Sequence, residues 1–245
     1  MVKSSTGTPN RPRNRRPFAA CGALLLLAAV YAGDSLRADD SVRTGGPSWP
    51  GSYAVRVAAL ALLETLNADL LSHDSATLTL EHWCEVHRLA SPPQIVAVRV
   101  PGVDKPASLE QRRELRVAPT EPLRYRRVLL RCGALVLSEA DNWYVPARLT
   151  PEMNRLLDTT DEPFGKVVRE LHFQRHTLSS RLLWQPLPEG WEMNAQAGSS
   201  GAAALELPPA LLEHRAVLHL PDGTPFSDLI ETYTSNVLAF APPRL

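Results

Sequence analysis

The chain has 245 residues, which is enough for one large domain or two small ones. Apolar residues make up 44% of the sequence, enough for a hydrophobic core, and the 22 prolines indicate many loops. The formal net charge is zero, but residues 1–32 contain five basic residues and no acidic residue. The remainder therefore has 21 basic and 26 acidic residues, a net charge of −5. Because nucleic-acid binding depends on clustered Lys and Arg, we expect no nucleic-acid partner.

The first 32 residues have the pattern of an export signal. The basic stretch RPRNRR precedes the apolar run PFAACGALLLLAAVYA, which ends at Ala32 with the small residues of a cleavage site. This pattern predicts a signal peptide; the alternative is an uncleaved membrane anchor, although a bilayer span needs about 20 apolar residues. RRPF also matches part of a twin-arginine export signal. We therefore expect a periplasmic protein, or one anchored to the inner membrane and facing the periplasm.

A polar segment rich in Gly and Pro, residues 33–52, is expected to link this signal to a folded domain at 53–245. Residues 54–72 predict a helix that is apolar almost all round and therefore buried. A second helix is expected at 79–88. Thr150 is expected to cap a third helix that has Pro151 at its first position, and a further helix should open near residue 161.

The strands are expected to form an antiparallel sheet. The alternation of apolar and polar residues and the turn residues predict them at 94–100, 123–132, 133–149, 176–186, 215–220 and 227–235. The last two flank the turn PDGTPF and predict a hairpin. Because helices and strands are mixed without a βαβ rhythm, the expected class is α+β.

Beyond the export segment the chain has two cysteines, Cys84 and Cys132. In an oxidising compartment they could form a disulfide. Their positions in the sequence do not show whether they are close in space, so two separate buried thiols are the alternative.

Several catalytic signatures are absent from the sequence, including GxSxG, GxGxxG, a phosphate loop and CxxC. His172 and His176 have the i, i+4 spacing of a metal site on an expected helix, with Glu170 nearby. No third ligand is evident, so surface histidines are the better interpretation and no metal is expected.

Two of the predicted strands contain candidate catalytic residues, arginines on one strand and a glutamate on the other. Arg127, Leu129 and Arg131 alternate onto one face of their strand, as Leu229, Glu231 and Tyr233 do on theirs. One sheet could therefore aim Arg127 and Glu231 into the same pocket. Arginine can grip a carboxylate through two hydrogen bonds, and a glutamate in a dry pocket can exchange a proton. The alternative is a solvated pair or a structural ion pair.

Four segments share their order and spacing with a known family: LLSHDSATLTLE, RRVLLRC, LTPEMNRLLDTTDEPFGKVV and GTPFSDLIETYT. Through them, from about Leu63 to Phe240, the sequence resembles chorismate lyase, which converts chorismate to 4-hydroxybenzoate and pyruvate. The resemblance implies an antiparallel sheet with helices packed on one side, an internal site covered by flaps, and no cofactor. Asp141 and Asn142 depart from it, because they stand where the family commonly has Gly-Arg.

The resemblance also implies roles for individual residues. The family's active-site arginine, which binds a substrate carboxylate, falls on Arg127, and its active-site glutamate falls on Glu231. Backbone amides that meet the product's carboxylate would come from about Ala76 and Phe164. We therefore expect an exported, monomeric lyase acting on chorismate. The alternative is a non-catalytic binding protein for a small aromatic acid, because the same fold serves as a ligand sensor in some transcription regulators.

Overall fold

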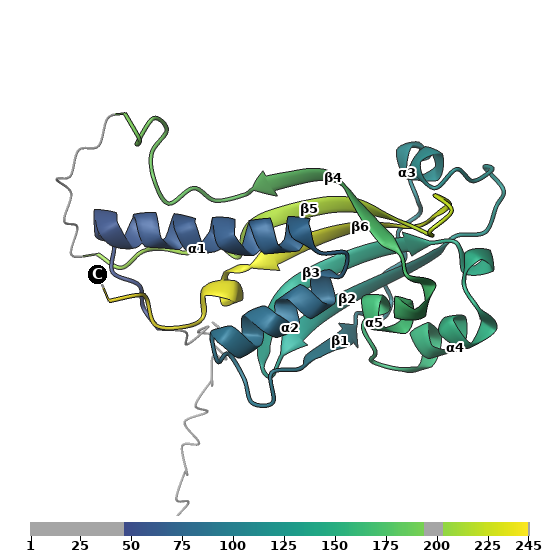
Figure 1. Ribbon diagram of the computed structural model, residues 1–245, viewed down its shortest axis with the longest axis horizontal. Coiled ribbons are helices and arrows are strands. Elements are labelled where there is room, and N and C mark those ends of the chain that lie inside the picture. The colour runs from purple at the N-terminus through teal and green to yellow at the C-terminus, as the bar shows by residue number, and fades with distance from the viewer. Residues whose placement is uncertain (1–46, 194–202, 245) are drawn as a thin grey trace, which may run out of the picture. The chain divides into compact units, whose positions relative to one another are not determined.

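A six-stranded antiparallel sheet forms the centre of the fold (Figure 1). The structure is a computed structural model that describes residues 47–193 and 203–244. The strands lie in the order β1-β2-β3-β6-β5-β4, and each neighbouring pair is antiparallel. They are β1 (Ile95–Arg99), β2 (Arg124–Cys132), β3 (Leu135–Tyr144), β4 (Gln174–Leu182), β5 (Ala210–His219) and β6 (Pro225–Thr234).

Two hairpins, β2–β3 and β5–β6, lie side by side in the centre of this sheet. The turn PDGTPF predicted the second hairpin, and the two strands of the first were predicted as part of an antiparallel sheet. The β2–β3 turn needs Gly133, whose φ of 56° favours glycine. A Cβ at this position would lie 2.7 Å from the Cβ of Ala90, so the turn also depends on a close approach.

Four helices cover one face of the sheet: α1 (Tyr53–Ser72), α2 (Ala76–Val86), α4 (Pro151–Thr159) and α5 (Phe164–Val167). α1 packs over β5, and α2 packs over β1 and β2. The side-chain oxygens of Ser52, Ser75 and Thr150 cap the first turns of α1, α2 and α4. The predicted α+β class, with helices on one side of an antiparallel sheet, is confirmed.

The other face of the sheet carries one short helix that the sequence reading missed, α3 (Leu109–Glu114). Ser108 and Gln111 form a capping box at its start. Just after this helix, Leu115 packs with Trp143 and Val145 in a small cluster of its own. Three 3-10 helices complete the description: η1 (Pro146–Arg148), η2 (Arg169–Leu171) and η3 (Ser235–Leu238).

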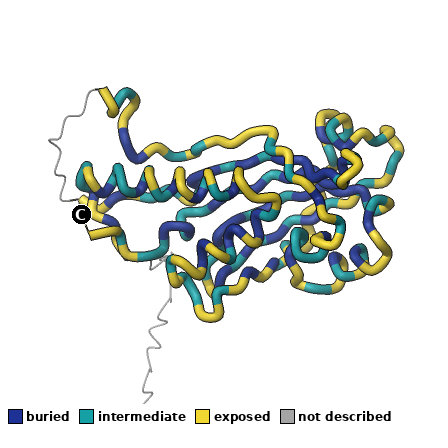
Figure 2. Tube along the Cα trace, viewed as in Figure 1, coloured by how far each residue is buried: buried dark blue, intermediate teal, exposed yellow. Residues whose placement is uncertain are grey.

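Burial follows this layered arrangement (Figure 2). The main core lies between α1, α2 and the sheet, where Leu63, Leu66 and Leu80 are fully buried. β5 and β6 are buried along most of their length, whereas the edge strand β4 is mostly exposed. The most protected sheet surface is therefore the central part of the helix-covered face.

The end of the expected linker belongs to the folded unit. Trp49 is 1% exposed, and its Nε1 donates hydrogen bonds to the carbonyls of Leu238 and Phe240. Pro50 also forms a β-bridge with Ala204. The linker prediction was wrong for this part, because a large aromatic side chain finds a buried place against the C-terminal segment.

The expected export segment, residues 1–32, lies outside the described residues, as does the linker up to residue 46. Within the described residues, none of the helices combines the length and the apolar character needed to span a membrane.

Cys84 and Cys132 form a disulfide, with their Cα atoms 6.4 Å apart. Cys84 lies on the buried side of α2, and Cys132 ends β2 on the face that α2 covers. Both residues are fully buried. The disulfide therefore ties the helix layer to the sheet.

Candidate functional site

A cavity lies between the helix-covered face of the sheet and the first turns of α2 and α5. It contains about 520 Å³ of space free of atoms, part of it open to solvent. Apolar side chains from β2, β3 and β6, among them Val128, Ala140 and Leu229, form its floor. Phe164 and Phe173 line it from the segment that joins α4 to β4. The site is therefore mostly apolar and has aromatic walls.

The strand register decides which charged residues reach this cavity. Val128 lies opposite Ala140, which lies opposite Glu231, so these three side chains share the cavity face. Arg127 lies opposite Asp141, one position further along, and therefore points to the other face.

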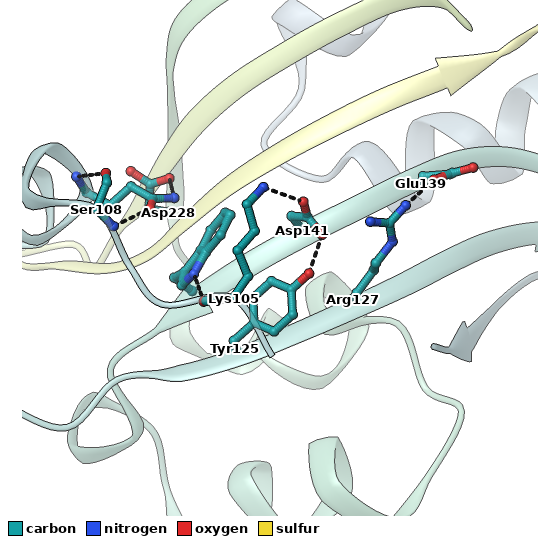
Figure 3. Close-up of polar contacts among 9 residues, drawn as sticks. Lys105, Ser108, Tyr125, Arg127, Glu139, Asp141 and Asp228 are labelled. Carbon is teal, nitrogen blue, oxygen red and sulfur yellow. Dashed lines mark hydrogen bonds and ion pairs between the residues drawn. The ribbon is translucent and has the colours of Figure 1, made fainter. Parts of the chain in front are cut away.

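The prediction that Arg127 and Glu231 share a pocket is therefore wrong. Alternation along each strand was read correctly, but alternation does not say which faces of two strands coincide. Figure 3 shows Arg127 paired with Glu139, and the distance from its Nη2 to Oε2 is 2.7 Å. On the same face, Asp141 accepts hydrogen bonds from the Tyr125 hydroxyl and the Lys105 ammonium group.

Arg126, the residue before Arg127, is the arginine that β2 contributes to the cavity. It is 5% exposed, and its Nη2 donates a hydrogen bond to the Glu162 carbonyl at 3.1 Å. Among the described residues, its Nε and Nη1 have no hydrogen-bond partner. Burial lowers the pKa of Arg126 to about 10, so the guanidinium is still charged at neutral pH. Buried donors on a charged group are costly unless something accepts from them.

A second arginine, Arg175 on β4, reaches the cavity and pairs with Glu231. The Nη2 of Arg175 lies 2.6 Å from Oε2 of Glu231, and both side chains are less than a tenth exposed. The Tyr233 hydroxyl donates to the same oxygen at 3.0 Å. Burial opposes the charge on Arg175, but Glu231, Tyr233 and Asp74 together outweigh it, so the pKa of Arg175 is raised. The predicted strand began at 176, so Arg175 fell just outside it and was missed.

A neutral histidine lies beside this ion pair. His214 on β5 is the cross-strand neighbour of Glu231 and is fully buried. Its Nε2 lies 2.8 Å from Oδ1 of Asn67 on α1. Burial, aided by the positive charge of Arg175, lowers the pKa of His214 to about 4. The histidine is therefore uncharged at neutral pH.

Ala76 and Phe164, whose backbone amides the resemblance implied, both line the cavity. They are the first residues of α2 and α5, where N–H groups have no partner within the helix. The two helix starts touch: a Cβ on Gly165 would lie 3.1 Å from the Ser75 hydroxyl oxygen. The structure places both residues where the resemblance implied, and their binding role stays a prediction.

The two departures from the family pattern lie on opposite faces of β3. Asn142 lines the cavity, and its Oδ1 accepts a hydrogen bond from the Ser227 hydroxyl at 2.6 Å. Asp141 lies on the far face, with Tyr125 and Lys105 (Figure 3). At this point of the cavity the chain therefore presents an amide in place of a basic group.

His172 and His176 do not lie on one helix. His172 follows η2 in a left-handed conformation with φ 50°, and His176 lies on β4. Across residues 47–193 and 203–244, no three His, Cys, Asp or Glu residues are placed to hold a metal ion.

The fold and the cavity together define an α+β protein with an internal, mostly apolar cavity that contains buried charged groups. The chain belongs to the same family as "Uncharacterized protein y4mC" of Sinorhizobium fredii (strain NBRC 101917 / NGR234). The two are 56% identical over 221 residues, which cover 90% of this chain and 92% of y4mC. No family model matches the sequence.

Several solved structures are similar at low sequence identity. The effector domain of PhnF from Mycobacterium smegmatis is 13% identical with a TM-score of 0.42, over 66% of this chain and 90% of that domain. Full-length PhnF from the same organism is 13% identical with a TM-score of 0.43, over 71% of this chain and 69% of PhnF. The possible transcriptional regulator YydK from Bacillus subtilis subsp. subtilis str. 168 is 15% identical with a TM-score of 0.37, over 62% of each chain. The matched part of this chain thus spans less than two thirds of YydK.

Proposed function

We propose that this protein binds a small aromatic carboxylic acid in the internal cavity. The observation that carries the proposal is Arg126, a buried guanidinium with two N–H-bearing atoms that lack a partner among the described residues. A carboxylate can accept from two guanidinium N–H groups at once. Such a ligand would satisfy donors for which the described residues offer no acceptor.

The walls of the cavity favour a ring as the rest of the ligand. Leu229 and Ala140 form an apolar floor, and Phe164 and Phe173 add aromatic surface. Small-molecule sites commonly combine such walls with a few polar groups that fix the orientation. Aromatic rings stack favourably on one another, so an aromatic acid suits the site better than an aliphatic one.

Calorimetric titration of the full chain with 4-hydroxybenzoate tests the binding proposal. We expect saturable binding to one site and at least a tenfold loss of affinity in Arg126→Gln, because the ligand carboxylate loses its charged partner. Arg127→Gln changes the neighbouring arginine, which lies on the opposite face, and should leave the affinity unchanged. Loss of binding in Arg127→Gln alone would contradict the assignment of the carboxylate to Arg126.

A second candidate function is the lyase reaction that cleaves chorismate to 4-hydroxybenzoate and pyruvate. It is favoured by one observation: the Glu231 carboxylate lines the same cavity as a buried arginine. Under this proposal Arg126, in place of Arg127, holds a carboxylate and orients the ring. Glu231 accepts the ring proton from the carbon next to the breaking C–O bond, and the departing enolpyruvyl group takes up a proton to become pyruvate.

Incubation of the purified chain with chorismate tests the second candidate. The lyase proposal expects equal amounts of 4-hydroxybenzoate and pyruvate, and most of this activity should disappear in Glu231→Gln while the circular dichroism spectrum is unchanged. No turnover above the uncatalysed rate, together with tight binding of 4-hydroxybenzoate, would exclude the lyase reaction and leave ligand binding as the function.

We also propose that the protein works outside the cytoplasm. The sequence pattern of residues 1–32 supports this, and so does the disulfide between Cys84 and Cys132, because disulfides form and persist mainly in oxidising compartments. Cell fractionation followed by thiol labelling is the measurement. We expect the protein in the periplasmic or membrane fraction. In urea, which exposes both buried cysteines, neither should be labelled until a reductant is added.

A further inference from the structure

We infer that Glu231 determines specificity by restricting the cavity to acids that carry a single negative charge. The inference rests on the proposed binding function and deepens it. In the intact protein Glu231 neutralises Arg175, which leaves Arg126 as the one buried charge of the cavity lining without a charged partner among the described residues.

Four charged residues line the cavity, and they differ in what balances them. Arg175 and Glu231 form a buried pair with an N–O distance of 2.6 Å. Asp74 is exposed, and its Oδ1 accepts a hydrogen bond from the Arg175 backbone N–H. Among the described residues, the Arg126 guanidinium donates a hydrogen bond only to a backbone carbonyl, that of Glu162. The buried charges of the cavity lining therefore sum to one positive charge.

One carboxylate on a ligand balances this charge, but two do not. A buried charge is costly unless a partner of opposite sign compensates it. The second carboxylate of a dianion would face Glu231, with Asp74 as a further negative group on the same lining. Like charges brought together at a buried interface cost enough to exclude wrong partners.

The arrangement of the strands places the two polar groups apart. Arg126 comes from β2, and Glu231 comes from β6, with β3 between these strands. Asn142 and Leu229, which lie opposite each other on β3 and β6, form the floor there. A ring whose carboxylate meets Arg126 therefore directs its other end toward Glu231. Arg175 and Tyr233 both donate to Oε2 of this glutamate, which leaves Oε1 to accept from a ligand hydroxyl.

The test compares two ligands of similar size by calorimetric titration of the full chain. 4-Hydroxybenzoate carries one negative charge, and terephthalate carries two. We expect wild-type protein to bind 4-hydroxybenzoate at least about tenfold more tightly. In Glu231→Gln, Arg175 loses its neutralising partner. The affinity for terephthalate relative to that for 4-hydroxybenzoate should therefore rise at least about tenfold.

Glu139→Gln is the matched control. Glu139 is also a strand glutamate paired with an arginine, but the pair lies on the opposite face of the sheet (Figure 3). The ratio of the two affinities should not change in this variant. If Glu231→Gln does not fold, Arg175→Met provides the second measurement. That variant leaves Glu231 unbalanced, so both acids should bind more weakly, terephthalate most of all.

The outcomes separate the inference from the function on which it rests. Equal affinities for the two acids in the wild type, or an unchanged ratio in Glu231→Gln, overturn the inference and leave the binding function intact. If the wild type binds neither acid, the proposed function fails, and the inference fails with it. Preference for the monoanion would also count against the lyase candidate, because chorismate carries two carboxylates.

Discussion

At the scale of single residues, His214 makes the stability of the protein depend on pH. A histidine has a pKa of about 6.5 in an unfolded chain, whereas burial lowers that of His214 to about 4 in the folded protein. Between these values the unfolded state binds more protons, so the free energy of unfolding falls as the pH falls. The contribution of the neutral, buried His214 to the free energy of unfolding is fully present above pH 6.5. About 3 kcal/mol of the free energy of unfolding is lost near pH 4.

Urea denaturation at several pH values between 7 and 4 measures this effect in wild type and in His214→Gln. Glutamine keeps a polar group near Asn67 but does not titrate, so the variant should lose much less stability on acidification. His82→Gln replaces an exposed histidine on α2 and should follow the wild-type curve. Parallel curves for wild type and His214→Gln would show that another group causes the acid sensitivity.

The residues of the cavity also show what a sequence can reveal about a site. Glu231 was singled out because it shares a predicted strand face with Leu229 and Tyr233 and because the family's active-site glutamate falls on it, and the structure places it in the cavity. Arg127 was chosen in place of Arg126 because the family's active-site arginine fell on it. Strand alternation could not correct this choice, because it fixes which residues share a face but not which face meets a neighbouring strand. That choice depends on the register across β3, which only the fold supplies.

At the scale of secondary structure, the contact between the starts of α5 and α2 gives a second prediction. Gly165 has ordinary helical geometry, but its Cβ in Gly165→Ala would lie 3.1 Å from the Ser75 hydroxyl oxygen. The methyl group should push the two helix starts apart where they line the cavity. We expect 4-hydroxybenzoate to bind several-fold more weakly and to dissociate faster, with little change in the free energy of unfolding.

Stopped-flow binding and urea denaturation of the same samples separate these effects. Arg155→Ala is the control, because its side chain pairs with Glu152 within α4 and does not line the cavity. Equal dissociation rates in wild type and Gly165→Ala would indicate that ligand retention does not depend on this contact.

Elements with strong local signals were the ones that the sequence predicted best. α1 was expected at 54–72 and spans Tyr53–Ser72, and Thr150 caps α4 as expected, with Pro151 at its first position. The helix expected from residue 161 was wrong in extent: α5 has four residues, and β4 already begins at Gln174. α3 was missed because it is short and polar, so it lacks the apolar periodicity that marks longer helices.

At the scale of the whole molecule, the disulfide between α2 and β2 should dominate the response of the protein to reduction. The sequence left open whether Cys84 and Cys132 meet, because they are 48 residues apart and only the packing of α2 on β2 brings them together. Closing a loop of this length stabilises the folded state by about 2–4 kcal/mol. Replacing both cysteines by alanine should reduce the free energy of unfolding by a similar amount.

The same link should also support the cavity, because α2 begins at Ala76 and β2 carries Arg126. We therefore expect the Cys84→Ala/Cys132→Ala protein to bind 4-hydroxybenzoate several-fold more weakly than wild type, as measured by calorimetry below the unfolding midpoint. Adding a reductant should weaken binding by wild type only when it is combined with urea, because both sulfur atoms belong to fully buried residues. A double variant with wild-type stability and affinity would show that the packing of α2 on the sheet needs no covalent link.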